Sequence, residues 1–132
     1  MSEKRSIFCC GCQTYVEARL TDGREIYPHR NDLHSLPFWK CDTCKNSVGC
    51  HHKTAQRTMP LGCISTPELK RARQQIHRVI DPLWQSGRVK RTELYGMIAH
   101  VLGVPKYHTA EIRSIDRANE VLRIARELET SL

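Results

Sequence analysis

The chain has 132 residues, of which 27% are charged and 39% hydrophobic, a composition typical of a soluble globular protein. Aromatic residues make up only 6%, so we expect a thin core that a bound metal ion would help to stabilise. The longest uncharged apolar stretch, from Tyr95 to Val104, is far shorter than the roughly 18 residues of a membrane span. These features exclude a disordered chain and a membrane-spanning protein.

The seven cysteines indicate metal ligands rather than disulfides. Residues Met1 to Arg5 are followed by no long apolar stretch of the kind found in secretory signals. An odd number of cysteines without an export signal is typical of reduced thiols. We therefore expect a cytoplasmic protein that holds a metal ion.

The first half of the chain predicts short strands. Residues 15–20 alternate apolar and polar side chains, and Asp22-Gly23 separates them from residues 24–27, a pattern that favours a β-hairpin. Residues 28–37 have the composition of a loop. Two further strands are expected over residues 38–40 and 47–51, on either side of a cysteine pair.

The second half predicts about three α-helices. The first begins around Ser65 to Glu68 and presents an apolar stripe formed by Leu69, Ala72, Ile76, Val79 and Ile80. Pro82 predicts a kink or a restart, with Asp81 as the new cap.

The two remaining helices also have one apolar face each. One is expected over residues 92–102, with Leu94, Ile98, Val101 and Leu102 inward and Gly103 at its end. The last starts near Ser114, and its inward face is formed by Ile115, Ala118, Val121, Leu122, Ala125 and Leu128.

Together these elements predict an α+β fold. A zinc-ribbon module of short antiparallel strands occupies residues 1–64, and a basic helical module occupies residues 65–132. Because short amphipathic helices need a surface to pack on, we expect the helices to pack on the ribbon as one compact unit.

Two Cys-x-x-Cys pairs carry the strongest chemical signal. Cys9 and Cys12 form the first pair, Cys41 and Cys44 the second, and 28 residues lie between the pairs. Each pair can form a tight knuckle with both sulfurs directed at one tetrahedral centre, as in zinc ribbons. The sequence therefore predicts one structural Zn²⁺, closed to further ligands by four thiolates.

Other residues leave part of the ligand set open. Cys10 lies inside the first knuckle and competes with Cys9, although its spacing from Cys12 does not suit a knuckle. Cys50, His51 and His52 follow the second knuckle, and any of them could replace a ligand or help to bind a second ion. Cys63 is expected to be a small buried residue.

The order of these features resembles the zinc-finger-containing domain family of bacteriophages and bacterial prophages. Beyond the cysteine pairs, the resemblance rests on several short segments between residues 8 and 125, namely Val48-Gly49-Cys50-His51, Pro60-Leu61-Gly62, Asp81-Pro82-Leu83-Trp84, Glu93-Leu94-Tyr95 and Leu102-Gly103. Gly11 lies between the cysteines of the first knuckle, and Gln13 stands where such knuckles usually have glycine. The resemblance implies a bound zinc ion and a location in the cytoplasm of a bacterial host. It does not indicate any activity.

The charge distribution favours nucleic acid as the partner. The net charge of +7 falls to about +5 when four thiolates bind one Zn²⁺. Residues 65–91 hold seven basic residues against Glu68 and Asp81, a local net charge of +5. These basic residues, which form the predicted nucleic-acid-binding surface, are Lys70, Arg71, Arg73, Arg78, Arg88, Lys90 and Arg91.

Two other functions stay open. The protein could bind or inhibit a host protein, with Phe38, Trp39 or Tyr107 as exposed anchors if they do not belong to the core. A metal-dependent nuclease would use His51 or His52 with His77, but no acidic cluster offers a magnesium site. We therefore expect a binding protein and no enzyme.

Overall fold

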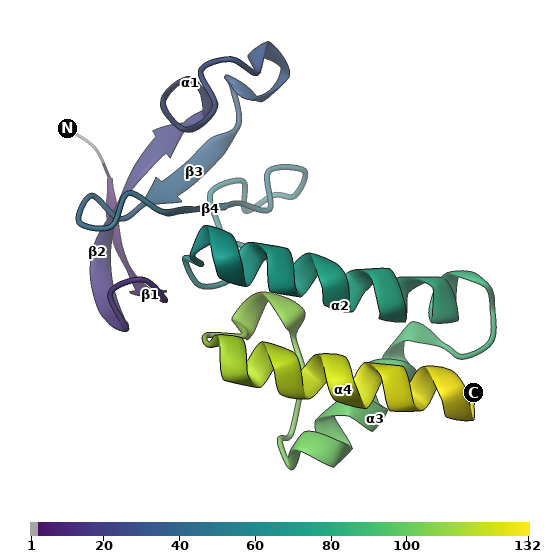
Figure 1. The fold of residues 1–132 in the computed structure, drawn as a ribbon. Coiled ribbons are helices and arrows are strands. Elements are labelled where there is room, and N and C mark those ends of the chain that lie inside the picture. The colour runs from purple at the N-terminus through teal and green to yellow at the C-terminus, as the bar shows by residue number, and fades with distance from the viewer. Residues whose placement is uncertain (1–2) are drawn as a thin grey trace. The chain divides into compact units, whose positions relative to one another are not determined.

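The computed structural model describes residues 3–132 and is a mixed α+β protein, as the sequence predicted (Figure 1). The chain divides into two compact units, Met1–Pro67 and Glu68–Leu132. The first unit holds all the strands and the second holds the three long helices. The expected packing of the helices on the ribbon stays a prediction.

The first unit is a four-stranded antiparallel sheet. Its strands are β1 (Lys4–Cys9), β2 (Thr14–Asp22), β3 (Pro37–Lys40) and β4 (Ser47–Gly49), and they lie in chain order across the sheet. Trp39 is paired with Leu20 on one side and Val48 on the other. Its side chain is 1% exposed, and its indole N–H donates to the carbonyl of Thr58 at 2.7 Å. Trp39 is therefore a core residue and cannot be an exposed anchor.

The hairpin expected at Asp22-Gly23 is wrong. Strand β2 runs through Asp22, and the next residues form a single helical turn, α1 (Gly23–Ile26). The Asp22 side chain accepts a hydrogen bond from the Arg24 amide at 2.9 Å, so it caps this turn. The hairpin partner of β2 is instead β1, a strand that the sequence pattern did not reveal because only Ile7 and Cys9 along it are fully buried.

Gly23 is required by a close backbone approach. A Cβ atom at this position would lie 1.8 Å from the carbonyl oxygen of Leu33. The Gly23 amide also donates to the carbonyl of Leu36 at 3.0 Å. These contacts hold residues 28–37 against the end of β2, and the loop expected there contains one 3₁₀ turn, η1 (Asn31–Leu33).

The second unit contains the three predicted long helices. They are α2 (Pro67–Gln85), α3 (Arg91–Leu102) and α4 (Ile115–Ser131). Ser114 caps α4 by accepting from the Arg117 amide at 3.1 Å, and Gly103 ends α3 with φ 74°. A second 3₁₀ turn, η2 (Thr109–Glu111), precedes α4.

The apolar faces of these helices form a core of their own. It includes Leu69, Ile76, Ile80 and Leu83 of α2, Leu94, Ile98 and Ala99 of α3, and Ala118, Val121, Ile124 and Ala125 of α4. Val101 was expected inside but is 55% exposed, because the buried face of α3 is displaced toward Ala99. Tyr107 is 5% exposed, which removes it from the possible anchors.

Of the kink or restart predicted at Pro82, the restart does not occur. Helix α2 continues through this proline to Gln85. Asp81 is not a cap: its Oδ1 accepts from Trp84 Nε1 at 3.1 Å and lies 3.2 Å from His77 Nδ1. These contacts hold the last turn together after proline removes one backbone hydrogen bond. Within residues 3–132, no helix is long and apolar enough to cross a membrane.

Candidate metal centre

The zinc knuckles are the turns of two hairpins at the same end of the sheet. Residues 10–13 join β1 to β2, which pair up to Cys9 and Thr14, and residues 41–46 join β3 to β4. Strands β1 and β3 are each antiparallel to β2, so they run in the same direction. The turns that follow them therefore lie at the same end of the sheet. This topology brings together cysteine pairs that are far apart in the sequence.

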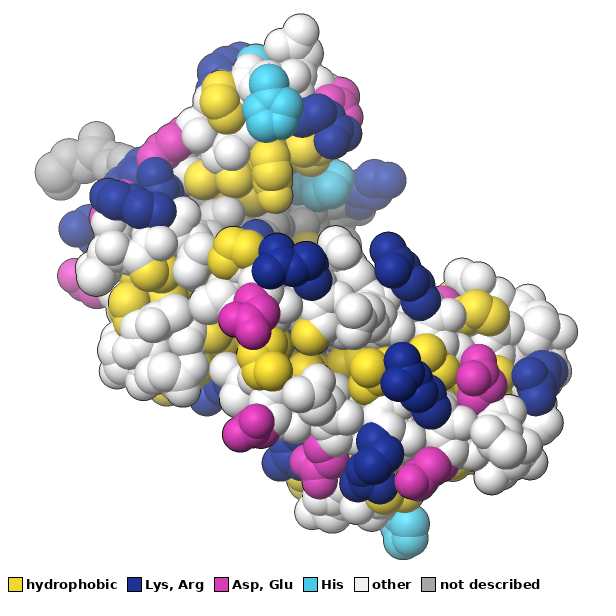
Figure 2. All heavy atoms as spheres, viewed as in Figure 1, with side chains coloured by type: hydrophobic (Ala, Val, Ile, Leu, Met, Phe, Trp, Pro, Cys, Tyr) yellow, Lys and Arg dark blue, Asp and Glu magenta, His cyan; other side chains and the backbone are white. Residues whose placement is uncertain are grey.

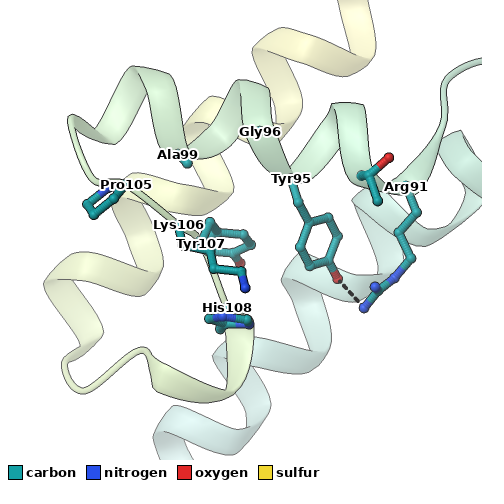
Figure 3. Close-up of a pocket in the computed structure, with 9 residues that line it drawn as sticks. Arg91, Tyr95, Gly96, Ala99, Pro105, Lys106, Tyr107 and His108 are labelled. Atoms are coloured by element: carbon teal, nitrogen blue, oxygen red, sulfur yellow. Dashed lines mark hydrogen bonds between the residues drawn. The ribbon is translucent and has the colours of Figure 1, made fainter.

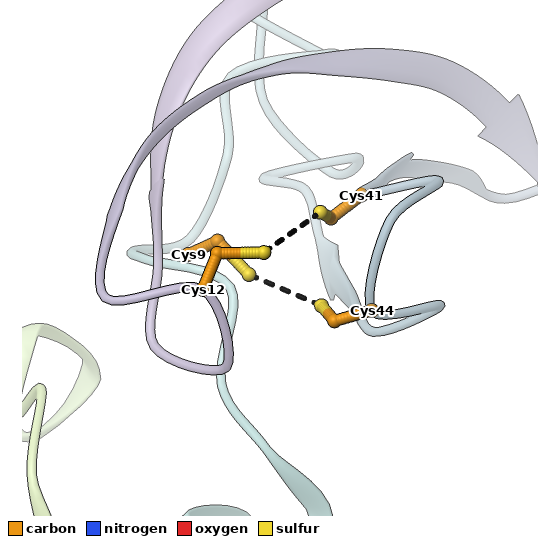
Figure 4. Close-up of side chains that lie close together, drawn as sticks. All are labelled: Cys9, Cys12, Cys41 and Cys44. Atoms are coloured by element: carbon orange, nitrogen blue, oxygen red, sulfur yellow. Dashed lines mark hydrogen bonds between the residues drawn. The ribbon is translucent and has the colours of Figure 1, made fainter.

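The four sulfurs form a compact cluster (Figure 4). Cys9 Sγ lies 3.2 Å from Cys44 Sγ, and Cys12 Sγ lies 3.7 Å from Cys41 Sγ. All four sulfurs of the cluster lie within 4.8 Å of one another. A tetrahedral zinc ion with Zn–S bonds of ~2.3 Å requires sulfurs that are about 3.8 Å apart. The cluster therefore fits one zinc ion.

The chemistry of the cluster is that of a structural zinc site. Cys9 and Cys41 are buried, and Cys12 and Cys44 are half-buried. Four thiolates complete the tetrahedral coordination of zinc, so no position is left for water or a substrate. The ion would hold the two hairpin turns together and extend the small apolar core that surrounds Cys9 and Cys41.

Both knuckles close with a residue in the left-handed region. Gln13 has φ 55° and Lys45 has φ 66°, each directly after the second cysteine of its pair. The Lys45 amide donates to the carbonyl of Cys41 at 2.8 Å, and the Asn46 side-chain amide donates to Cys44 Sγ at 3.3 Å. The first knuckle thus adopts the turn expected of such motifs although it lacks the usual glycine.

The thiols differ in how readily they ionise. Burial opposes ionisation of Cys41, but backbone N–H groups of Cys44 and Thr43 contact its sulfur and lower its pKa to about 7. Burial and the neighbouring Cys44 thiol raise the pKa of Cys9 above its ordinary value. Zinc binding must therefore displace protons, among them that of the buried Cys9 thiol.

The competing residues lie outside the cluster. Cys10 points elsewhere and its sulfur is 3.6 Å from that of Cys63, which is buried as predicted. Cys50 belongs to the apolar core, and burial raises the pKa of its thiol. His51 is exposed, and His52 Nδ1 lies 3.3 Å from the carbonyl of Cys50. Among the described residues, the only group of three or more potential metal ligands is the cluster of Cys9, Cys12, Cys41 and Cys44.

Ion pairs connect the second knuckle to the sheet, a feature that the sequence analysis did not identify. Arg19 donates to both oxygens of Glu25 at 2.9 and 2.8 Å and to both oxygens of Asp42 at 2.9 Å. Lys40 donates to Glu25 at 2.7 Å. The Arg19 guanidinium, with Lys40 and Thr21, holds the pKa of Glu25 well below its usual range, and Arg19 also lowers the pKa of Asp42.

Replacing Arg19 should destabilise the protein in a pH-dependent way. Because the carboxyl pKa values are lower in the folded state, the stabilisation is fully present above about pH 5. It declines as the pH falls below ~4, toward the lowered pKa values of Glu25 and Asp42 in the folded protein. We expect Arg19→Met to reduce the free energy of unfolding at pH 7 by about 1 kcal/mol, since the pairs are partly exposed. Urea titrations of both proteins between pH 7 and 3 would show the difference shrinking in acid, and a difference independent of pH would contradict the assignment.

The predicted nucleic-acid-binding residues all lie in the helical unit, and they differ in exposure and in the contacts that they make. Arg71, Arg78 and Lys90 are exposed and pair with no carboxylate among the described residues. Lys70 is half-buried, and burial together with Arg73 lowers its pKa. Figure 2 shows lysine and arginine side chains spread over the visible face among acidic ones, not gathered into one patch.

Three of the arginines also make contacts within the unit. Arg73 donates to the carbonyl of Ile112 at 2.6 Å. Arg88 donates to the carbonyl of Leu132 at 2.6 Å, beside the last turn of α4. The Arg91 guanidinium lies 4.4 Å from the centre of the Tyr95 ring and 5.7 Å from that of Trp84.

Comparisons with known proteins agree with the metal site. Searches of curated proteins and of solved structures found no match to the chain. A family model described as a zinc-finger-containing domain matches residues 5–128, which include both knuckles, α2, α3 and most of α4. The chain belongs to the zinc-finger-containing domain family.

Proposed function

We propose that this protein binds nucleic acid through exposed basic side chains of its helical unit, with the zinc-stabilised sheet as a scaffold. The observation that carries the proposal is the position of its unpaired cations. Arg71 and Arg78 lie two turns apart on the exposed face of α2, and Lys90 precedes α3. Phosphates would neutralise these charges, and release of counterions would drive binding.

Several other basic side chains pair with carboxylates, unlike Arg71, Arg78 and Lys90, and this difference supports the proposed binding surface. On α4, Arg117 pairs with Glu120 at 3.0 Å and Arg123 pairs with Glu127 at 3.2 Å. In the sheet unit, Arg19 and Lys40 pair with Glu25. The exposed face of α2 instead combines its arginines with glutamines, which also hydrogen-bond phosphates. Its charge is thus available to a polyanion.

We place the protein in the cytoplasm of a bacterial host that carries a phage or prophage, and we assign it no catalytic role. The zinc site has no open position for chemistry. His77 lies beside Asp81 on α2, so it has a partner in its own helix. His51 and His52 belong to the sheet unit and lie outside the metal cluster.

Binding to a host protein is the second candidate. Two of the three aromatic anchors considered for it, Trp39 and Tyr107, are buried, which weakens this candidate. The large exposed apolar side chains of the described residues are scattered over both units, and they include Tyr15, Leu61 and Val101. A surface of this kind is ordinary for a soluble protein.

Removing two charges from α2 should weaken nucleic-acid binding in a salt-dependent way. We expect the double variant Arg71→Gln/Arg78→Gln to bind a fluorescent DNA duplex more weakly. The slope of log K against log salt concentration should fall by about 2, because two phosphate contacts are lost. Fluorescence anisotropy at several salt concentrations measures both quantities.

A matched control removes two charges from α4. Arg123→Gln/Arg126→Gln changes the net charge equally and should leave the slope nearly unchanged. The proposed surface is wrong if both double variants behave alike. The proposed function itself fails if the unchanged protein binds no duplex, single-stranded DNA or RNA even at low ionic strength.

A further inference from the structure

A pocket in the helical unit combines aromatic walls with positive charge (Figure 3). It has a volume of about 300 Å³ and lies between one face of α3 and the segment formed by residues 105–108. Tyr95 projects into it from α3, and the Tyr107 ring packs against that of Tyr95 edge to face, with ring centres 5.4 Å apart. The volume is at the lower end for ligand sites, which suits a small planar group.

The basic lining of the pocket favours binding of an anion. Its lining includes Arg91, Lys106 and His108 and contains no acidic side chain. The Arg91 guanidinium lies over the Tyr95 ring, and its Nη2 donates to the Tyr95 hydroxyl at 3.4 Å. Lys106 and His108 are exposed beside the opening, so they can approach a charged group from solvent.

The walls of the pocket are held in place before any ligand binds. Tyr107 is 5% exposed, and its hydroxyl is hydrogen-bonded to that of Thr109 at 2.8 Å. On the helix side, Gly96 has no side chain, and a Cβ atom there would meet nothing within 4 Å. Gly96 thus leaves the space next to Tyr95 open, although helix α3 does not itself require glycine at this position.

From these features we infer that the pocket binds one unpaired nucleotide of a single-stranded nucleic acid. The base would lie in the space beside Gly96, against the Tyr95 ring, and its phosphate would lie near Lys106 and His108. Aromatic side chains with neighbouring cations are the usual means of binding single strands, because every base has a face that can stack. The inference rests on the proposed function and names the form of nucleic acid.

The decisive experiment fills the pocket without removing a contact. Gly96→Leu places a side chain in the open space, and its Cβ has room. We expect it to weaken binding of fluorescein-labelled dT12 by roughly 10-fold, the effect of losing one stacked base. Binding of a 12-base-pair duplex should stay unchanged, because paired bases cannot enter the pocket.

Two further variants test the chemistry of the site. Tyr95→Leu should weaken dT12 binding to a similar extent, whereas Tyr95→Phe keeps the ring and should retain binding. Lys106→Gln should lower the salt slope for dT12 by about 0.7, the value for one contact on a single strand. Arg126→Gln, an equal loss of charge on α4, should leave the slope unchanged. Circular dichroism and thermal unfolding of each variant would establish that it is folded.

The outcomes separate this inference from the proposed function. If Gly96→Leu binds dT12 as well as the unchanged protein does, the pocket is not the site, although nucleic-acid binding would stand. If no oligonucleotide binds, the proposed function fails as well. Thymidine monophosphate is the third probe: if it binds as tightly as dT12, the pocket is a site for free nucleotides and the single-strand inference is overturned.

Discussion

Cys41→Ser is expected to abolish zinc binding and unfold the sheet unit. Zinc binding to four-ligand structural sites contributes roughly 10–16 kcal/mol at neutral pH. That contribution equals or exceeds the total stability of most small domains, ~5–15 kcal/mol. Cys41 is 2% exposed, its sulfur lies 3.7 Å from that of Cys12, and it belongs to the core that includes Trp39. Losing this ligand therefore removes the metal and opens the core around it.

Metal analysis and amide hydrogen exchange on the full chain would measure the effect. We expect the bound zinc to fall from one per chain to none and the amides of β1 to β4 to lose protection. The helical unit has its own buried core, so amides in α2, α3 and α4 should keep theirs.

Cys63→Ser is the matched control. Cys63 is also buried, but its sulfur lies near Cys10 and outside the metal cluster. This variant should keep one zinc per chain. A Cys41→Ser protein that retains its zinc and its protected sheet would show that the assigned ligand set is wrong.

Gly23→Ala should cause the second large loss of stability. The added methyl group would lie 1.8 Å from the Leu33 oxygen and 2.4 Å from the Leu33 carbonyl carbon. Because both atoms belong to the backbone, no side-chain rotation can relieve the clash, and the segment that returns to β3 must move. We expect a loss of about 3 kcal/mol or more, at the upper end for overpacking. Urea unfolding of the zinc-loaded protein would measure it.

Gly96→Ala provides the comparison for this variant. Gly96 lies inside α3 with nothing within 4 Å of an added Cβ. Alanine is the better helix former, so this change should stabilise the helical unit by roughly 0.5–1 kcal/mol. Equal and small effects of the two substitutions would contradict the close approach at Gly23.

Local sequence patterns predicted the helices well because their signals act within a few residues. Ser114 caps α4 and Gly103 ends α3, as their positions in the sequence indicate. Pro82 shows the limit of such signals: proline disfavours a helix locally, yet α2 continues through it with help from contacts of Asp81. The Asp22-Gly23 prediction failed for a similar reason, because Gly23 is needed for contact with a distant segment and not for a turn.

The spacing of its cysteines by itself determined that this chain has a four-sulfur site for zinc, because each Cys-x-x-Cys pair forms its knuckle locally. Only the tertiary structure decided that Cys9, not Cys10, joins Cys44, since strand pairing sets which sulfur faces the cluster. The pocket beside Tyr95 was also beyond sequence reasoning. Its walls come from a helix and a later loop segment, and the fold of the helical unit is what brings them together.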